Sequence, residues 1–397
     1  MGVLSGLRVV EFSAFIAAPL ASATLASLGA DVIRVEQLGG GIDAGRWPLH
    51  EGRSLYRAGL DRGKRSVSLD LRTSRGRELA AALVTAPGEH AGIFVTNLGG
   101  AAWASYDQLA AARRDLIMIL LSGTPSGRPA VDYTVNAGAG FPLVTGPAQA
   151  DRPVNHVLPA WDVSAGLLIA VGMLAAERHR RLTGEGQLVD LALSDVALEI
   201  ADRLGFLAEA SLVEAARPRL GNDLFGSYGR DFRTCDGRDA IVVALTPGQW
   251  ASLGKATGLA EAFAAIEARH GVDLRDEGAR FNHRQEISAL LEPWFGQRTL
   301  DEAATLLDAH GVLWGPYRTF KELVRDEPRG AAAPAGPLRF SATEPERSRP
   351  AVEIGADTES VLRDVLGIES EEIDLLRSDH VINGAGQQVP VEPGRRL

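Results

Sequence analysis

The chain has 397 residues, a hydrophobic fraction of 45% and a formal net charge of −10. This length suits two domains, the apolar fraction is that of a packed globular protein, and the acidic balance argues against a nucleic-acid-binding protein. The single cysteine, Cys235, excludes an intrachain disulfide and suits a reducing compartment. We find no targeting segment and no apolar run that spans a bilayer, so we expect a cytoplasmic protein without a membrane partner.

The N-terminal region alternates short apolar strands with helices, which is typical of a parallel α/β sheet. We predict strands at Leu7–Glu11 and Asp31–Glu36, separated by a loop at Ser13–Pro19 and a helix at Leu20–Leu28. A strand–helix–strand unit that ends in an acid also resembles a dinucleotide site. The loop, however, lacks the glycines that let a pyrophosphate approach the backbone, so the pattern favours the sheet over a nicotinamide site.

Further elements follow at similar intervals. The stretch from Gly123 to Pro153 is rich in Gly, Pro and small residues, so we predict loops around a site there. The expected strands are Ser66–Leu69, Gly92–Thr96 and Leu116–Leu121, and the expected helices are Arg75–Leu83, Tyr106–Arg113, Ala165–Arg181 and Ser194–Ala215.

The pattern changes after this point and predicts a second, smaller α+β domain at 225–325, inserted between a large domain at 1–200 and a C-terminal return at 330–397. A Pro-, Ala- and Arg-rich linker at Gly330–Pro350 is expected to lead back to the large domain, with a frayed tail from Asn383. The expected elements are a hairpin at Arg233–Val243 and helices at Pro247–Thr257, Arg284–Phe295, Leu300–Ala309 and, last in the chain, Asp357–Leu366.

One acid, Asp162, stands at the start of a long uncharged stretch, because Val163 to Ala176 contains no charged residue. One interpretation is a helix N-cap, in which the carboxylate accepts hydrogen bonds from the first turn. The other is a nucleophile that attacks a thioester carbonyl where water is excluded. The local pattern leaves both open.

The segment around Asp162 resembles the nucleophile segment of the class III CoA-transferases, the family of formyl-CoA transferase, carnitine CoA-transferase and alpha-methylacyl-CoA racemase. The matching pieces are Asp162, the apolar helix Ala165–Ala176, the basic end Arg178–Arg181, the turn Thr183–Gln187 and Asp195. The resemblance implies that Asp162 is the catalytic nucleophile. It also implies a Rossmann-like large domain built from both chain ends, a small inserted domain and an interlocked homodimer.

The resemblance also implies where coenzyme A binds. Lys64 and Arg65 match a family element that holds CoA phosphates, although a solvated basic loop would read the same way, and Asn97 matches a residue near CoA at a strand end. The turn Ser13–Pro19 matches a family turn, which assigns Phe15, Ile16 and Ala17 to the binding site. In formyl-CoA transferase a Gln in this turn contacts the acyl group. Ile16 replaces it here, so the acyl selectivity is expected to differ.

Four further residues are predicted as substrate contacts. They are Arg46, as a fork for a free carboxylate; His156, which could instead be a packed loop histidine; and Gly221 and Tyr228, which bound a candidate lid. The family's racemase histidine would fall near Val131, which cannot exchange a proton, so racemisation is disfavoured. The histidines show no metal-ligand spacing, and we predict no metal.

Within the family, several segments resemble an enzyme that moves CoA between the two carboxyls of one C5 dicarboxylate: Gly39–Trp47, Asn155–Asp162, Glu177–Gln187 and Gly221–Phe232. This resemblance extends to about Phe320. It implies that the partner is an acyl-CoA thioester of a small dicarboxylic acid, with coenzyme A as part of the substrate and no permanently bound cofactor. Intermolecular CoA transfer and non-catalytic CoA binding remain the alternatives.

Overall fold

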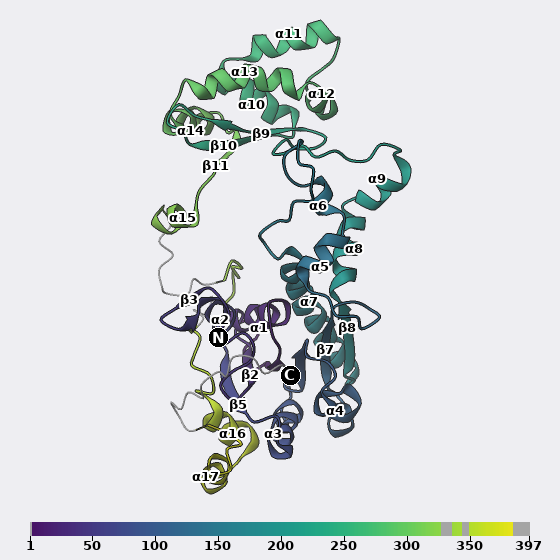
Figure 1. Ribbon diagram of the computed structural model, residues 1–397, viewed down its shortest axis with the longest axis vertical. Coiled ribbons are helices and arrows are strands. Elements are labelled where there is room, and N and C mark those ends of the chain that lie inside the picture. Colours follow the sequence, from purple (N-terminus) through teal and green to yellow (C-terminus); the bar gives the residue numbers. More distant parts are fainter. Residues whose placement is uncertain (1, 327–335, 344–348, 384–397) are drawn as a thin grey trace. The chain divides into compact units, whose positions relative to one another are not determined.

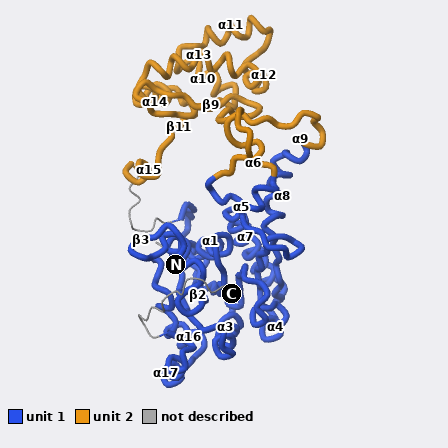
Figure 2. Tube along the Cα trace, in the orientation of Figure 1, with its two compact units in different colours: residues 1–139, 157–209, 329–397 blue, residues 140–156, 210–328 orange. Residues whose placement is uncertain are grey.

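The computed structural model describes residues 2–326, 336–343 and 349–383 (Figure 1). The chain divides into two compact units, each of which is described by itself (Figure 2). The large unit comprises 1–139, 157–209 and 329–397, and the small unit comprises 140–156 and 210–328. The small unit contains the predicted insertion at 225–325, but it begins earlier and also takes 140–156, which we had placed in the large domain. Much of the predicted linker, and the tail after Asn383, lie outside the described residues.

A wholly parallel six-stranded sheet forms the centre of the large unit, in the order β5-β2-β1-β6-β7-β8. This confirms the predicted α/β class. The order reverses between β1 and β6, and ligands of such sheets bind at the carboxyl ends of the strands at this switch point. The strands are β1 (Arg8–Phe12), β2 (Asp31–Gln37), β5 (Arg65–Leu69), β6 (Ile93–Thr96), β7 (Ile117–Ser122) and β8 (Gln187–Ala192).

Helices cover both faces of this sheet. Side chains alternate along a strand, so Val10 lies in the core formed with α3, α4, α16 and α17, while the equally buried Val9 lies on the other face, where α1 and α7 contact the strands. Since α17 follows α16, the prediction that Asp357–Leu366 is the last helix is wrong. The helices are α1 (Ala17–Ser27), α3 (Ser74–Thr85), α4 (Tyr106–Ala112), α7 (Ala160–Thr183), α16 (Thr358–Leu366) and α17 (Ser370–Ser378).

The long helix α7 packs closely on α1. A Cβ at Gly166 would lie 2.8 Å from the carbonyl oxygen of Ala17, so only glycine lets the two backbones approach this far. By length and composition α7 could cross a membrane, but it is partly buried in the α/β unit, as a core helix is. The contact sets the first turn of α7 beside the start of α1.

Three sequence predictions in the large unit need correction. Helix α5 (Asp132–Gly138) lies inside the stretch predicted as loops. The single helix predicted at Ser194–Ala215 is two helices, α8 (Leu193–Arg203) and α9 (Phe206–Leu212), separated at Gly205, whose φ of 80° ends the first helix. The edge strand β8 is absent from the predicted strands. The remaining elements are β3 (Leu49–His50), β4 (Arg53–Ser54), α2 (Leu55–Leu60) and the 3-10 turn η1 (Ala102–Ala104) in the large unit, and α6 (Phe141–Val144) in the small one.

The small unit packs helices on a three-stranded antiparallel sheet in the order β11-β10-β9. Its core contains Trp250, Phe263 and Phe295, with the Trp250 and Phe263 rings stacked 4.4 Å apart. The elements are β9 (Tyr228–Arg233), β10 (Asp239–Ala244), β11 (Leu313–Pro316), α10 (Pro247–Thr257), α11 (Ala260–His270), α12 (Glu277–Asn282), α13 (Arg284–Gly296), α14 (Leu300–Ala309) and α15 (Phe320–Asp326).

Candidate active site

Asp162 lies in the first turn of α7, which begins at Ala160. The capping position belongs to Pro159, and no side chain of the helix's own start caps it. The interpretation of Asp162 as the N-cap is therefore wrong, because the helix begins before it. Within the described residues, no hydrogen bond reaches the Asp162 carboxylate.

A second acid caps this helix from outside. The Oδ2 atom of Asp132, the first residue of α5, accepts hydrogen bonds from the backbone N–H groups of Trp161 (2.8 Å) and Asp162 (3.1 Å). One turn along α5, the Oδ1 atom of Asn136 accepts a hydrogen bond of 3.1 Å from the Trp161 indole. Two side chains of α5 thus fix the first turn of α7, and with it the direction of Asp162.

The environment of Asp162 holds its carboxyl in an unusual state. Burial and the negative charge of Asp132 together raise the pKa of Asp162 to about 6, burial being the larger cause, while Arg46 acts in the opposite direction. Asp132 itself is 2% exposed, and its buried Oδ1 atom has no hydrogen-bond partner in the described part of the chain. The ionised form of Asp162 is therefore less stable at this site than it would be in water. This makes its carboxylate more reactive toward an acyl carbon.

The loop between β1 and α1 is held by a side chain at each of three successive residues. Ser13 donates a hydrogen bond to Glu11, Ala14 exchanges two hydrogen bonds with the Asn97 amide (2.8 and 2.9 Å), and Phe15 donates its N–H to Asp43 (2.9 Å). Phe15 has a φ of 65°, a conformation that non-glycine residues rarely adopt. Such strain persists only where the surroundings enforce it, and it is common at binding sites.

Two aromatic rings position Arg46 near this loop. Its guanidinium carbon lies 5.1 Å from the centre of the Phe15 ring and 4.6 Å from that of Tyr56. The Tyr56 hydroxyl is buried with no hydrogen-bond partner among the described residues, and burial raises the pKa of Tyr56 well above its ordinary range. The charges of Arg46, Asp43 and Asp162 all act on this hydroxyl, so the four side chains form one cluster.

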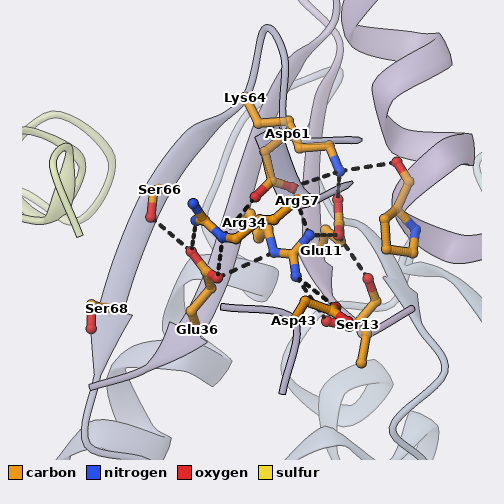
Figure 3. Close-up of polar contacts among 12 residues, drawn as sticks. Glu11, Ser13, Arg34, Glu36, Asp43, Arg57, Asp61, Lys64, Ser66 and Ser68 are labelled. Atoms are coloured by element: carbon orange, nitrogen blue, oxygen red, sulfur yellow. Dashed lines mark hydrogen bonds and ion pairs between the residues drawn. The ribbon is translucent and has the colours of Figure 1, made fainter. Parts of the chain in front are cut away.

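Behind the loop lies a buried network of charges centred on Arg34 of β2 (Figure 3). Burial opposes the charge of Arg34, but the surrounding carboxylates raise the pKa of its guanidinium. Burial likewise disfavours ionised Asp61, yet Arg34 holds the pKa of Asp61 below its usual range. The acids around Arg34 are Asp61 (2.6 Å), Glu11 (3.4 Å), Asp43 (3.4 Å) and Glu36 (3.5 Å).

Comparison with known proteins shows the family to which the chain belongs. A model of CoA-transferase family III matches residues 4–358, which is most of the chain. The chain belongs to this family. It is 49% identical to the 2-methylfumaryl-CoA isomerase of Chloroflexus aurantiacus, with 96% of this chain and 98% of that protein aligned. The alignment therefore continues beyond Phe320.

Two further relatives agree with this family assignment. The succinyl-CoA:mesaconate CoA-transferase of Haloarcula hispanica is 31% identical over 78% of each chain. A CaiB/BaiF family protein from Brucella suis, solved by crystallography, matches with a TM-score of 0.76 and 26% identity over 92% of this chain and 99% of that one. The protein is therefore an enzyme of the class III CoA-transferase type.

The structure places the predicted CoA-binding residues in unexpected surroundings. Lys64 is only 2% exposed, and its ammonium group binds Glu11 (2.6 Å) and the carbonyl oxygen of Pro19 (3.0 Å). The solvated-loop interpretation is wrong for Lys64, and in this arrangement the ammonium is bound by the protein's own acid. Arg65 pairs with Asp31 through two hydrogen bonds. Lys64 and Asn97, which is bound to Ala14, therefore support the loop between β1 and α1, whereas the Arg65–Asp31 pair joins the first residues of β5 and β2.

The remaining predicted contacts belong to the small unit, separate from the unit that carries Asp162. Tyr228 is 1% exposed in the small unit's core, where its hydroxyl lies 3.1 Å from that of Ser288. The Tyr228 side chain is thus part of the packed core of the small unit. Gly221, with a φ of 64°, donates its N–H to Gly146, and His156 lies in the preceding part of the same unit.

Asp132, Asp43 and Tyr56 were missed by the sequence analysis. The signal for Asp132 was present, because an acid and an amide four residues apart in Asp132–Asn136 share one face of a helix. The Gly- and Pro-rich flanks concealed that helix. No sequence signal places Asp43 against Phe15, since this contact depends on the return of the chain after β2.

Proposed function

We propose that this family member catalyses the intramolecular transfer of CoA between the C1 and C4 carboxyls of 2-methylfumaryl-CoA. The observation that carries the proposal is the Asp162 carboxyl, which is poised with a pKa of about 6 at the start of α7 and accepts no hydrogen bond from the described residues. The 49% identity to the isomerase of Chloroflexus aurantiacus supports the choice of substrate.

The first step uses Asp162 as a nucleophile. Its carboxylate attacks the thioester carbonyl at C1, the C–S bond breaks, and a mixed anhydride and a CoA thiolate form. At neutral pH, above its pKa, Asp162 is mostly ionised. Repulsion from Asp132 raises the energy of that ionised state, and the attack moves the negative charge away to sulfur. The acid that caps the helix therefore favours acyl transfer.

Three further exchanges complete the reaction. The thiolate attacks the aspartyl carbonyl, which gives an aspartyl-CoA thioester and the free dicarboxylate. The C4 carboxylate attacks this thioester and releases the thiolate again, and the thiolate then attacks the C4 carbonyl of the new anhydride. The product is the C4 thioester, and Asp162 is regenerated. Water would hydrolyse each acyl intermediate, so the site must exclude water during turnover.

We propose that the cluster beside Asp162 recognises the free carboxylate and the methyl group. Arg46, fixed between the rings of Phe15 and Tyr56, supplies the fork for the carboxylate. The Tyr56 hydroxyl is a donor without a partner among the described residues, so it suits the same carboxylate or the carbonyl oxygen. Ile16 provides an apolar wall, and the Phe15–Ala17 backbone borders the CoA thioester. We also propose His156 and Gly221 as substrate contacts.

The test is the conversion of chemically prepared mesaconyl-C1-CoA to the C4 ester, followed by chromatography in the presence of isotope-labelled free mesaconate. Intramolecular transfer predicts the C4 ester without label. Label in the thioester product would instead establish intermolecular transfer, an alternative that the 31% identity to a succinyl-CoA:mesaconate CoA-transferase supports.

Non-catalytic CoA binding is the second alternative. Hydroxylamine or borohydride added during turnover should trap the acyl or thioester form of Asp162, which peptide mass spectrometry detects. Absence of any adduct together with absence of turnover would favour the binding protein.

We also propose that the enzyme is a cytoplasmic homodimer. The large apolar side chains of Leu168, Val171 (61% exposed) and Leu198 (57%) are exposed on α7 and α8, and exposed apolar side chains on packed helices are candidates for a subunit contact. Val171→Glu should convert the dimer to a monomer in analytical ultracentrifugation, whereas a monomeric wild-type protein would exclude the proposal.

A further inference from the structure

Three potential metal ligands meet in the small unit. His270 is the last residue of α11, His283 joins α12 to α13, and Glu286 lies in the first turn of α13. One ligand atom from each of the three lies within 4.8 Å of the others, and in the described part of the chain this is the one such group of His, Cys, Asp or Glu. The histidine spacing does not reveal this group, because His270 ends α11, whereas His283 and Glu286 lie at the start of α13.

The distances suit a single ion of transition-metal size. The Glu286 Oε1 atom lies 2.8 Å from Nε2 of His270 and 3.8 Å from Nδ1 of His283. Tetrahedral zinc, with bonds of about 2.0–2.2 Å, needs its ligand atoms roughly 3.3 Å apart. Side-chain rotations alone close the remaining difference, since all three side chains are partly exposed, between 19% and 38%.

The two histidines and Glu286 are already oriented to bind a metal ion. The imidazole rings of His270 and His283 lie with their centres 4.4 Å apart, and one nitrogen of each lies near the same Glu286 oxygen. Arg269 binds the other carboxylate oxygen of Glu286 at 3.0 Å and leaves Oε1 for an ion. A hydrogen-bonded partner that orients a ligand in this way is typical of metal sites.

We propose that His270 Nε2, His283 Nδ1 and Glu286 Oε1 bind one divalent transition-metal ion, with zinc as the best match. Two imidazoles and a carboxylate are the donor set that zinc prefers, and water completes the fourth position. The ion joins the C-terminal end of α11 to the start of α13. This site is independent of the proposed CoA chemistry, and it holds the helices of the small unit together.

The test uses the full-length protein, stripped of metal with a chelator and titrated with Zn²⁺ in a calorimeter. We expect one zinc per chain. His270→Ala and His283→Ala should each lower the affinity at least about tenfold, and Glu286→Gln, which keeps the side-chain shape, should do the same. Co²⁺ should give the intense visible absorption of a tetrahedral site in the wild type and not in these three variants. Zinc should also raise the midpoint of thermal unfolding in the wild type and not in the variants.

His310→Ala is the matched control. His310 is an exposed histidine of the same unit at the C-terminal end of α14, where Nδ1 lies 3.0 Å from the Leu306 carbonyl oxygen. Its loss should leave zinc binding unchanged. Equal zinc affinity in the His270 and His283 variants, or absence of saturable binding in the wild type, overturns the proposal. Circular dichroism without metal verifies that each variant is folded.

Discussion

Two clusters of buried charge lie in the large unit, and they are built on opposite principles. Around Arg34, every acid faces a cation at hydrogen-bonding or ion-pair distance, and Lys64 and Arg57 complete the set. Around Asp162, two acids are brought together, and the nearest cation, Arg46, is engaged with aromatic rings. The first cluster is compensated, whereas the second leaves a carboxyl and a tyrosine hydroxyl without partners among the described residues.

The difference indicates that the Arg34 cluster has a structural role and the Asp162 cluster a chemical one. A buried network in which each charge has a partner fixes the local geometry, and here it holds the Phe15 loop through Asp43. Because its charges are stabilised by their partners, they are unreactive. An uncompensated buried acid costs stability, and such groups persist where catalysis uses them. The predictions below test whether the two clusters respond to mutation as this contrast requires.

The largest effect is expected at Asp162. Asp162→Asn removes the nucleophile and should lower kcat by several orders of magnitude, measured as turnover of mesaconyl-C1-CoA. Asp107→Asn, an exposed acid in the first turn of α4, is the control and should keep full activity. If an Asp162 variant keeps about a tenth of the wild-type rate, Asp162 is not the nucleophile.

The same variant should be more stable than the wild type at neutral pH. The pKa of Asp162 is raised from 3.8 to about 6 in the folded state, so the folded protein holds this proton more tightly. Stability is therefore lost as the pH rises from about 4 to 6, and Asn, which does not ionise, avoids the loss. Urea unfolding should give a higher midpoint for Asp162→Asn at pH 8 and equal midpoints near pH 4.

Arg34→Met should affect stability most. The substitution leaves up to four buried acids short of their central cation, and breaking a buried ion pair costs about 3–5 kcal/mol of unfolding free energy. Arg233→Met is the control, since Arg233 pairs with Asp239 on the exposed surface and its loss should change stability little. An unchanged urea midpoint for Arg34→Met would show that the network does not contribute to the stability of the fold.

The sequence predicted the local parts of this site and missed the long-range ones. The parallel strands, α7 and the special position of Asp162 follow from apolar patterns within a few residues. Lys64 is predicted as a phosphate ligand, but the sequence does not show that its ammonium group is buried against Glu11, which is distant in the chain. The cap on α7 was missed for the same reason, since Asp132 reaches the helix from α5.

Lys64→Ala is consequently a poor test of CoA binding. It would leave Glu11 buried without its nearest cation, so a loss of affinity could not be distinguished from a loss of folding. The Phe15–Ala17 segment and Arg46 are better targets, because they lie outside the compensated network.

Asp132→Asn separates the two roles of Asp132. The amide oxygen still accepts the N–H groups of Trp161 and Asp162, so the cap is kept, while the negative charge is lost. Without this charge the pKa of Asp162 should fall, and the acid limb of the pH–rate profile, where activity is lost on protonation of Asp162, should move to lower pH. Asp132→Ala removes both roles and should also lower stability. An unshifted acid limb in Asp132→Asn would mean that Asp132 acts as a cap alone.

The smallest effect is expected at Ile16, where substrate selectivity is tested. Ile16 precedes α1 as its capping residue and offers a branched apolar wall beside Phe15. One buried methyl group is worth roughly 0.8 kcal/mol, so mesaconyl-CoA should be preferred over an unmethylated dicarboxylic ester such as fumaryl-CoA by a few-fold. Ile16→Gln should narrow this preference mainly by slowing the methylated substrate, as measured by kcat/KM for each ester. A side chain that only packs against α1 would give lower stability with an unchanged ratio of the two kcat/KM values, and that result would exclude Ile16 from substrate recognition.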